Sequence, residues 1–420
     1  MDVELTIDSL AFGRAAVGRV EGRVVFVEGA APGERVRARV RRDHGSYAEA
    51  DLIEVLEPGS VRVAPPCPIV DECGGCPWQH VDYQAQLAAK RRAIVDALER
   101  IGGIADPEVG EVTPSPQTLG YRNRLSLRFE RGRMGFYQAR SNTLVPVPDC
   151  LLAEPRIREA LPQAERFAGG LKTDINRVEI ATRGLLPGLV LALQSKGRLR
   201  HADTLATREM VETPDTPVRG VVLSGRGWRR QWGEIGRRFE VAEGVCVELP
   251  GASFGQVNTA ANRILVATVV DAVLQGRAPR VLELFAGAGN FSFALARSAA
   301  RVIAVDEDAA AVEAGRRAVE DSRVPGLRFV ASAAKTYLER HAERPDVLVV
   351  DPPRSGLGDA VTAAGALRPA RIVYVSCNPP TLARDLRALG DHGYRLVRAD
   401  PIDLFPHTFH VETVCTLELT

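Results

Sequence analysis

Apolar and polar positions alternate at period two through the first part of the chain. Residues 1–58 contain five such segments, separated by breaks rich in glycine, proline and aspartate. This alternation with turn residues between the segments is typical of short β-strands, and five strands in so short a stretch predict a small closed barrel of the OB type. The predicted strands are VELTIDSL, RAAVGRV, RVVFVEGA, ERVRARVRR and YAEADLIEVL.

A different pattern begins at about residue 249, where short apolar runs alternate with alanine-rich segments long enough for helices. Alternating strands and helices predict a mostly parallel, doubly wound sheet with helices on both faces, as in Rossmann-like α/β domains. The predicted strands are RVLELF, RVIAVD, LRFV, DVLVVD, RIVYVS and ETVCTLEL.

The chain is therefore expected to fold as three domains. Residues 1–58 form the OB-like barrel, residues 59–248 form a mixed α+β central domain with a helix at residues 83–101, and residues 249–420 form the α/β domain. Basic and aromatic residues interleave in the central stretches YRNRLSLRFERGRMGFYQARS and RGWRRQWGEIGRR. Such interleaving fits RNA contact and fits a solvated surface equally well.

Charge composition does not by itself indicate a nucleic-acid partner, because 54 basic residues balance 53 acidic ones. In the fourth barrel strand, however, four arginines alternate with small apolar residues, so they share one face. The four are Arg35, Arg37, Arg39 and Arg41. This basic stripe is either an RNA-binding surface or an edge strand protected by charge.

Compartment and membrane association follow from what the sequence lacks. No apolar run approaches the roughly 18 residues that cross a bilayer, and the acidic start MDVELTIDSL does not fit a signal peptide. We therefore expect a cytoplasmic protein without membrane contact.

A glycine-rich turn follows the first apolar strand of the α/β domain, in VLELFAGAGNFSFALA. Gly287 and Gly289 allow the backbone to approach a ligand closely at the carboxyl end of the strand. Asp306 closes the next strand, where a carboxylate can accept the hydroxyls of a ribose. Dinucleotide and S-adenosylmethionine enzymes share these features, but Ser292 stands where a dinucleotide enzyme usually has its third glycine.

Three later segments carry the residues expected to react. Asp351 ends a strand in DPPRSGL, Cys377 follows a strand in SCNPPTLARDL, and Glu412 lies in DLFPHTFHVE. A thiolate that adds to carbon 6 of uracil makes carbon 5 nucleophilic enough to accept a methyl group, and a base must then remove the proton on carbon 5. Cys377 is the predicted nucleophile and Glu412 the predicted base.

These motifs resemble the signatures DPPRxGL, SCNPxTLARDL and DxFPxTxHVE of the RNA uracil-5-methyltransferases, and residues 1–58 resemble a TRAM domain. The resemblance implies S-adenosylmethionine as methyl donor and RNA as partner. It places Gln256, Phe285, Gly287, Gly289, Asn290, Asp306 and Asp351 around the donor. Phe254 is expected to help hold a flipped base. Ala333 departs from the family pattern, which usually has Asp or Asn there.

Four cysteines are arranged as a potential ligand set. Cys67, Cys73 and Cys76 have the spacing C-x5-C-x2-C, and Cys150 follows far along the chain. Four thiolates can bind zinc or a [4Fe–4S] cluster, and the spacing does not separate the two. The resemblance favours the cluster, because one branch of the family carries C-x5-C-G-G-C with a distant fourth cysteine.

The RNA target is not written in the sequence. Within the family, a TRAM domain combined with the cysteine cluster favours 23S ribosomal RNA over the transfer RNA T-loop, and we expect a monomer. Two alternatives stay open: a dehydrogenase, and a non-catalytic iron–sulfur protein that binds RNA.

Overall fold

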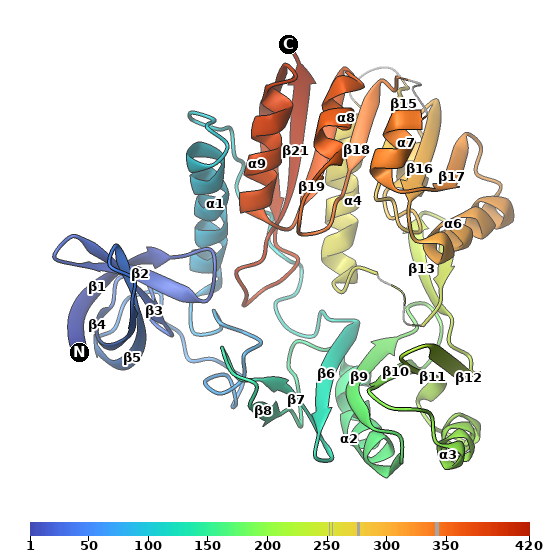
Figure 1. The fold of residues 1–420 in the computed structure, drawn as a ribbon, viewed down its shortest axis with the longest axis horizontal. Coiled ribbons are helices and arrows are strands. Elements are labelled where there is room, and N and C mark those ends of the chain that lie inside the picture. The colour runs from blue at the N-terminus through green and yellow to red at the C-terminus, as the bar shows by residue number, and fades with distance from the viewer. Residues whose placement is uncertain (252, 254, 275–277, 341–343) are drawn as a thin grey trace.

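A computed structural model gives the fold and describes the whole chain except residues 252, 254, 275–277 and 341–343. Its first part is a closed barrel with the strand order β1-β2-β3-β5-β4 (Figure 1). Valines, leucines, isoleucines and alanines that point inward at every second position fill the barrel. The strands are β1 (Asp2–Leu10), β2 (Ala15–Val20), β3 (Arg23–Glu28), β4 (Arg35–Asp43) and β5 (Tyr47–Glu57).

The arginines of β4 lie on the outer face of the barrel, as predicted. β4 pairs with both β1 and β5, so it is not an edge strand. Each of the four arginines of the predicted stripe also pairs with an acidic side chain of a neighbouring strand, which the sequence pattern did not indicate. The pairs are Arg35 with Glu4 and Glu57, Arg37 with Glu4 and Glu54, Arg39 with Asp2, and Arg41 with Glu49 and Asp51.

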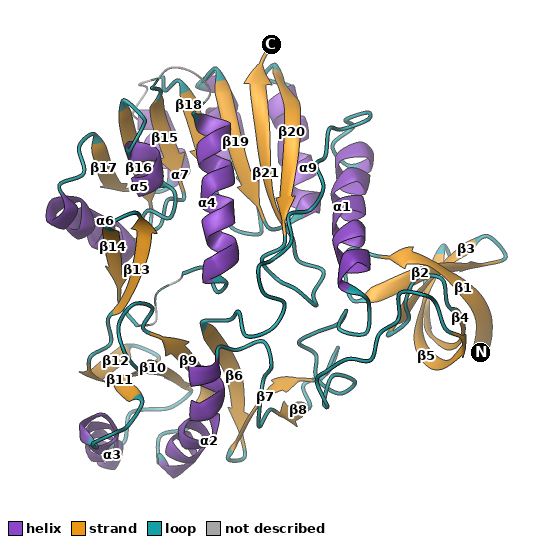
Figure 2. Cartoon of the chain, turned by 180° about the vertical axis from the view of Figure 1, so that it is seen from behind, coloured by secondary structure: helices purple, strands orange, loops and turns teal. Residues whose placement is uncertain are grey.

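The central part contains a mixed sheet with the order β12-β11-β10-β9-β6-β7-β8. Helices α2 (Pro155–Gly170) and α3 (His201–Glu212) lie along this sheet (Figure 2), and apolar residues of α2 pack with apolar residues of the strands. The strands are β6 (Arg124–Glu130), β7 (Arg133–Tyr137), β8 (Leu144–Pro146), β9 (Ile175–Thr182), β10 (Leu189–Ser195), β11 (Val218–Gly225) and β12 (Trp228–Gly233).

The last part is the expected doubly wound sheet, with the order β17-β16-β15-β18-β19-β21-β20. The first five of these strands run parallel to one another. β21 runs antiparallel to both of its neighbours, β19 and β20. The sequence analysis missed β20. The strands are β15 (Arg280–Leu284), β16 (Arg301–Asp306), β17 (Leu327–Ala331), β18 (Val347–Val350), β19 (Arg371–Ser376), β20 (Tyr394–Ile402) and β21 (Glu412–Leu419).

Each strand of this sheet sends alternate residues to opposite faces, and both faces are apolar. Leu348 and Val350 pack with α1, α7, α8 and α9, whereas Val347 and Val349 pack with α4, α5 and α6 (Figure 2). Burial on both faces explains why the strands read as continuous apolar runs. The helices are α1 (Tyr83–Arg100), α4 (Thr259–Val273), α5 (Ser292–Ala296), α6 (Ala309–Ser322), α7 (Ala334–Arg340), α8 (Ala360–Ala366) and α9 (Pro379–Gly390).

Two segments from the predicted central domain pack against this α/β core. Helix α1 contributes Leu87, Ile94 and Leu98 to the cluster formed with α9. The hairpin of β13 (Arg237–Ala242) and β14 (Val245–Leu249) packs with the cluster that includes α6. No helix among the described residues is both long and apolar enough to cross a membrane. The domain boundaries at residues 58 and 248 stay predictions.

Candidate active site

The turn after β15 has the backbone that a closely approached ligand requires. Phe285, Gly287 and Gly289 have φ values of +61°, +56° and +100°. A Cβ atom at residue 289 would come within 2.7 Å of the rings of Phe293 and Phe329, so only glycine fits there. A Cβ atom at residue 287 would meet no atom within 4 Å, so the space above this turn is open.

Asp306 is fixed at the end of β16 by this turn. One of its carboxylate oxygens accepts the Gly287 N–H at 2.7 Å, and the other accepts the Asp308 N–H at 2.8 Å. Asn290 exchanges two side-chain hydrogen bonds with Asn262 of α4, at 2.8 and 3.0 Å. The carboxylate therefore has a defined orientation beside the open space at Gly287.

A buried acid lies beneath the same turn. Glu283 accepts a hydrogen bond from the Ser292 hydroxyl at 2.6 Å, and its other carboxyl oxygen has no partner. Burial raises the pKa of Glu283 to about 8. Ser292, which stands at the third glycine position of a dinucleotide motif, thus donates a hydrogen bond to this acid.

Gln256 lies just before α4, and its backbone carbonyl accepts a hydrogen bond from the Asn123 side chain. Phe254 lies outside the described residues.

Cys377 and Glu412 meet at the ends of adjacent antiparallel strands. Ser376 of β19 pairs with Thr413 of β21, so Cys377 and Glu412 occupy the next position across the two strands. The Asn378 amide and the Thr381 hydroxyl both donate to the Arg354 carbonyl at 3.1 Å, which joins the SCNPP segment to the DPPR segment. The structure therefore gathers three motifs that are far apart in the sequence.

The electrostatics of this cluster are dominated by burial. Cys377 is half-buried rather than sealed in the interior, and burial raises its pKa to about 11. The negative charge of Glu412 raises the pKa of Cys377 further, whereas Arg354, which contacts the thiol, lowers it. In the free protein the thiol is therefore protonated at neutral pH.

The two acids beside the thiol also hold their protons tightly. Burial raises the pKa of Glu412 to about 8, with a further increase from Asp351 and a decrease from Arg354. Burial alone raises the pKa of Asp351 to about 7. The site thus combines a thiol, two acids that titrate near neutral pH and one arginine, which is suited to nucleophilic attack followed by proton transfer.

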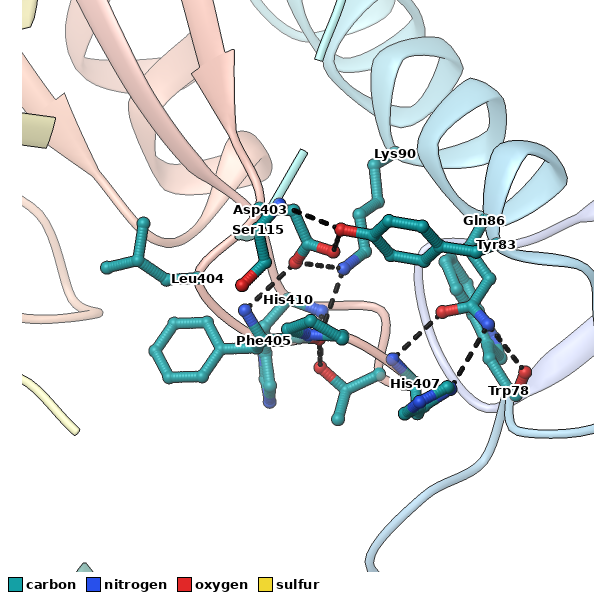
Figure 3. Close-up of polar contacts among 12 residues, drawn as sticks. Trp78, Tyr83, Gln86, Lys90, Ser115, Asp403, Leu404, Phe405, His407 and His410 are labelled. Atoms are coloured by element: carbon teal, nitrogen blue, oxygen red, sulfur yellow. Dashed lines mark hydrogen bonds and ion pairs between the residues drawn. The ribbon is translucent and has the colours of Figure 1, made fainter. Parts of the chain in front are cut away.

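The loop before Glu412 is held by residues that the sequence analysis did not single out (Figure 3). Lys90 of α1 forms a fully buried ion pair with Asp403 at 2.6 Å and also donates to the Phe405 carbonyl at 3.1 Å. The Tyr83 hydroxyl donates to the second oxygen of Asp403 at 2.9 Å. These contacts tie the loop at residues 403–410 to α1.

Two further residues connect this loop to the barrel. The side-chain amide oxygen of Gln86 accepts the backbone N–H of His407 at 2.8 Å, and the backbone N–H of Trp78 donates to the His407 carbonyl at 3.1 Å. The Trp78 indole N–H donates to the carbonyl of Gly13, between β1 and β2, at 3.1 Å. The sequence signal was a run of polar side chains at residues 83, 86 and 90, which share the otherwise apolar face of α1.

The four cysteines of the predicted cluster line one cavity of about 110 Å³. Burial raises the pKa of Cys76 to about 12, and the charges of Cys150, Cys73 and Cys67 raise it further. The thiols are therefore near one another, although residue 150 is distant in sequence. Among the described residues, no group of three or more His, Cys, Asp or Glu side chains is close enough to hold a metal ion.

Comparisons with known proteins agree with this arrangement. The family described as tRNA (Uracil-5-)-methyltransferase matches residues 238–420, and the TRAM domain matches residues 2–53. The 23S rRNA (uracil(1939)-C(5))-methyltransferase RlmD of Aeromonas hydrophila is 34% identical over 99% of this chain and 96% of its own length. The chain belongs to the RNA uracil-5-methyltransferase family.

Other members extend the likeness to sequence and structure. An uncharacterized RNA methyltransferase of Thermosynechococcus vestitus is 34% identical over 99% of this chain and 97% of its own length. The crystal structure of the Pyrococcus abyssi tRNA (uracil-54, C5)-methyltransferase in complex with S-adenosyl-L-homocysteine superposes with a TM-score of 0.76, at 27% identity, over 99% of this chain and all of that chain. These matches confirm the predicted TRAM barrel and methyltransferase fold, and they favour methyl transfer over the dehydrogenase alternative.

Proposed function

We propose that this methyltransferase transfers a methyl group from S-adenosylmethionine to carbon 5 of a uridine in 23S ribosomal RNA. The observation that carries the proposal is the position of Cys377 and Glu412 at facing strand ends, with Arg354 between their motifs. Relatives that resemble this chain over nearly its whole length are named as 23S rRNA methyltransferases, which supports the ribosomal target. The likeness to the archaeal tRNA enzyme keeps the T-loop as the alternative.

We propose that the residues predicted for the donor site hold S-adenosylmethionine. The open space at Gly287 and the fixed carboxylate of Asp306 suit a nucleoside whose ribose hydroxyls reach that carboxylate. Phe285, Asn290 and Gln256 are proposed to complete its walls, and Asp351 is proposed to lie between the donor and the base. When bound, S-adenosylmethionine supplies the methyl group on a positively charged sulfur.

The chain's own residues then carry the proposed covalent steps. The Cys377 thiol first loses its proton to solvent. The thiolate then forms a bond to carbon 6 of uracil, and the electron pair of the 5,6 double bond makes carbon 5 nucleophilic. Carbon 5 takes the methyl group and now carries both a methyl and a hydrogen. The ionised form of Glu412 takes up that proton, the double bond re-forms and the bond between carbon 6 and sulfur breaks, which returns the thiolate.

Two substitutions test these roles. Cys377→Ala is expected to abolish formation of 5-methyluridine in a 23S rRNA transcript, because no adduct can form. Glu412→Gln is expected to form the adduct and methylate it but to release product slowly. The adduct is measured as a protein–RNA band that survives denaturing electrophoresis.

The matched control is Glu418→Gln, because Glu418 lies on the same strand β21 and pairs with Arg371 away from the thiol. This variant is expected to turn over without a trapped band. Full turnover by Glu412→Gln with no trapped band contradicts the assignment of the base. Methylation of a T-loop transcript instead of 23S rRNA identifies the alternative target.

We also propose that Cys67, Cys73, Cys76 and Cys150 bind a [4Fe–4S] cluster, with zinc as the alternative. Support comes from the four thiols, which line one cavity although residue 150 is distant in sequence. Methyl transfer consumes no electron, so the proposed role of the cluster is to order the segment at residues 67–76 and to position RNA. Residues 59–248 would then be the cluster-bearing domain.

Metal content decides between the two. Protein purified without oxygen is expected to contain iron and sulfide and to show the broad visible absorption of a cluster. Cys150→Ser is expected to lose iron together with thermal stability, whereas Cys246→Ser, a change at a cysteine outside the cavity, is expected to keep both. Stoichiometric zinc without sulfide contradicts the cluster.

A further inference from the structure

The barrel and the central sheet each carry a group of basic side chains, and the two groups differ in whether carboxylates pair with them. On the barrel, Arg35, Arg37, Arg39 and Arg41 of β4 are paired with carboxylates, as described above, so their charges are compensated. Most of the basic residues are arginine, and only four of the 54 are lysine. Two of these lysines, Lys172 and Lys196, lie in the same cavity of the central sheet.

This cavity has a volume of about 480 Å³ and lies at the end of the central sheet that points away from the α/β domain (Figure 1). Its walls are the turn between β6 and β7, the C-terminal end of α2 and the start of β9. Four cations line it, namely Arg128, Arg131, Lys172 and Lys196, together with the acids Glu130 and Asp174. The lining therefore has a formal excess of two positive charges.

The four cations have no carboxylate partner among the described residues. All four side chains are exposed, and Arg128 stacks its guanidinium over the ring of Tyr137 at 5.2 Å. Glu130, one of the two acids, instead accepts the Tyr137 hydroxyl at 2.6 Å. An uncompensated group of cations in a concave site concentrates positive potential and attracts anions.

The loop that carries Lys172 is held in place from beneath. Asp203 of α3 is buried, and its carboxylate accepts the N–H groups of Lys172 and Thr173 at 2.8 and 2.6 Å. The Thr173 hydroxyl donates to the same carboxylate at 2.5 Å. The lysine side chain is therefore presented from an ordered loop, which lowers the entropy lost when it binds an anion.

We propose that this cavity binds backbone phosphates of the substrate RNA, in a segment outside the target uridine. The inference rests on the proposed function for its ligand class. Strand β6 connects the two places: Arg124 donates to the carbonyls of Ser253 and Gly255, which lie just before Gln256 of the proposed donor site, and Arg128 lines the cavity. Four strand residues span about 13 Å, so one RNA strand can contact both ends.

The test measures how salt weakens the binding of a fluorescein-labelled 20-nucleotide oligouridine. Each phosphate contact contributes about 0.7 to the slope of log affinity against log salt for single strands. Lys172→Gln combined with Lys196→Gln is expected to reduce the slope by about 1.4 and to weaken binding several-fold at low salt. Lys→Arg at both positions is expected to restore the slope.

The matched control is Arg92→Gln combined with Arg317→Gln, which removes the same net charge from two exposed arginines that already pair with Asp96 and Glu313. An equal loss of slope in this control, or no loss in the lysine variant, overturns the site. Cys377→Ala should keep the full slope while it loses methylation. A protein that makes no 5-methyluridine but shows the lysine-specific slope disproves the proposed function and leaves the anion site standing.

Discussion

Cys377, the proposed nucleophile, lies among groups that oppose its ionisation. Burial and the charge of Glu412 both raise the pKa of the thiol, and Arg354 is the neighbour that lowers it. Glu412 itself has a raised pKa of about 8, so at neutral pH it is mostly protonated and exerts little repulsion. The thiol is opposed most strongly above about pH 8, where Glu412 has lost its proton.

This arrangement predicts the direction in which Glu412 changes the pKa of Cys377. In Glu412→Gln the repulsion is absent at every pH, so the pKa of Cys377 is expected to fall. The measurement is the pH dependence of Cys377 alkylation by iodoacetamide, followed by mass spectrometry of the peptide that contains it. A midpoint equal to that of Glu418→Gln would show that the acid does not act on the thiol.

Stability should also depend on pH through the buried acids. Glu283, Asp351 and Glu412 all have folded-state pKa values above those of the unfolded chain. Their contribution to stability is complete below the unfolded pKa near 4 and is lost as the pH rises through about 7 to 8, because ionisation is easier in the unfolded chain. We expect a lower melting temperature at pH 9 than at pH 6, and a smaller difference between the two in Glu283→Gln.

At the scale of elements, the loop at residues 403–410 depends on helix α1. Lys90 and Asp403 are fully buried, and removing either partner leaves an uncompensated charge.

The fold around the loop could be predicted only in part. The strand ends that carry Asp351, Cys377 and Glu412 follow from apolar runs and motifs, but the pairing of residue 90 with residue 403 joins points that no local pattern connects.

Lys90→Met is therefore expected to lower the free energy of unfolding by about 3–5 kcal/mol, measured by urea titration. The control Lys335→Met removes a lysine whose pair with Asp359 is exposed, and should cost about 1 kcal/mol or less. Hydrogen exchange at the amides of Phe405 and His407 should accelerate in Lys90→Met alone. If the pair positions Glu412, the variant also accumulates the trapped RNA adduct; a parallel loss of adduct and turnover indicates a structural role only.

At the scale of the whole molecule, the barrel is joined to the active-site loop through Trp78. The indole is fully buried, its N–H reaches the barrel at Gly13, and its backbone N–H reaches His407. Phe12 of the barrel also packs edge-on against Phe409 of the loop, with ring centroids 5.5 Å apart. The sequence separated the barrel correctly as a unit but contained no sign of this contact, because it depends on three segments that meet only after folding.

Trp78→Phe keeps the apolar ring and removes the donor, so it leaves the Gly13 carbonyl unpaired at a cost of about 1–3 kcal/mol. We expect the barrel to detach more often and the segment between β5 and α1 to be cut faster by a protease. Trp232→Phe, in β12 of the central sheet, is the control and should not change the cutting rate. Equal cutting rates in the two variants would show that the hydrogen bond does not hold the barrel.

Because Trp78 is buried between the barrel and the loop, its intrinsic fluorescence can report whether the barrel is attached. The chain has three tryptophans, and the other two, Trp228 and Trp232, both lie in β12. With those two replaced by phenylalanine, the wavelength of maximum fluorescence emission of Trp78 would report whether water reaches its indole. This measurement needs no label. It would distinguish RNA binding that detaches the barrel from the loop at residues 403–410 from RNA binding that leaves the barrel attached.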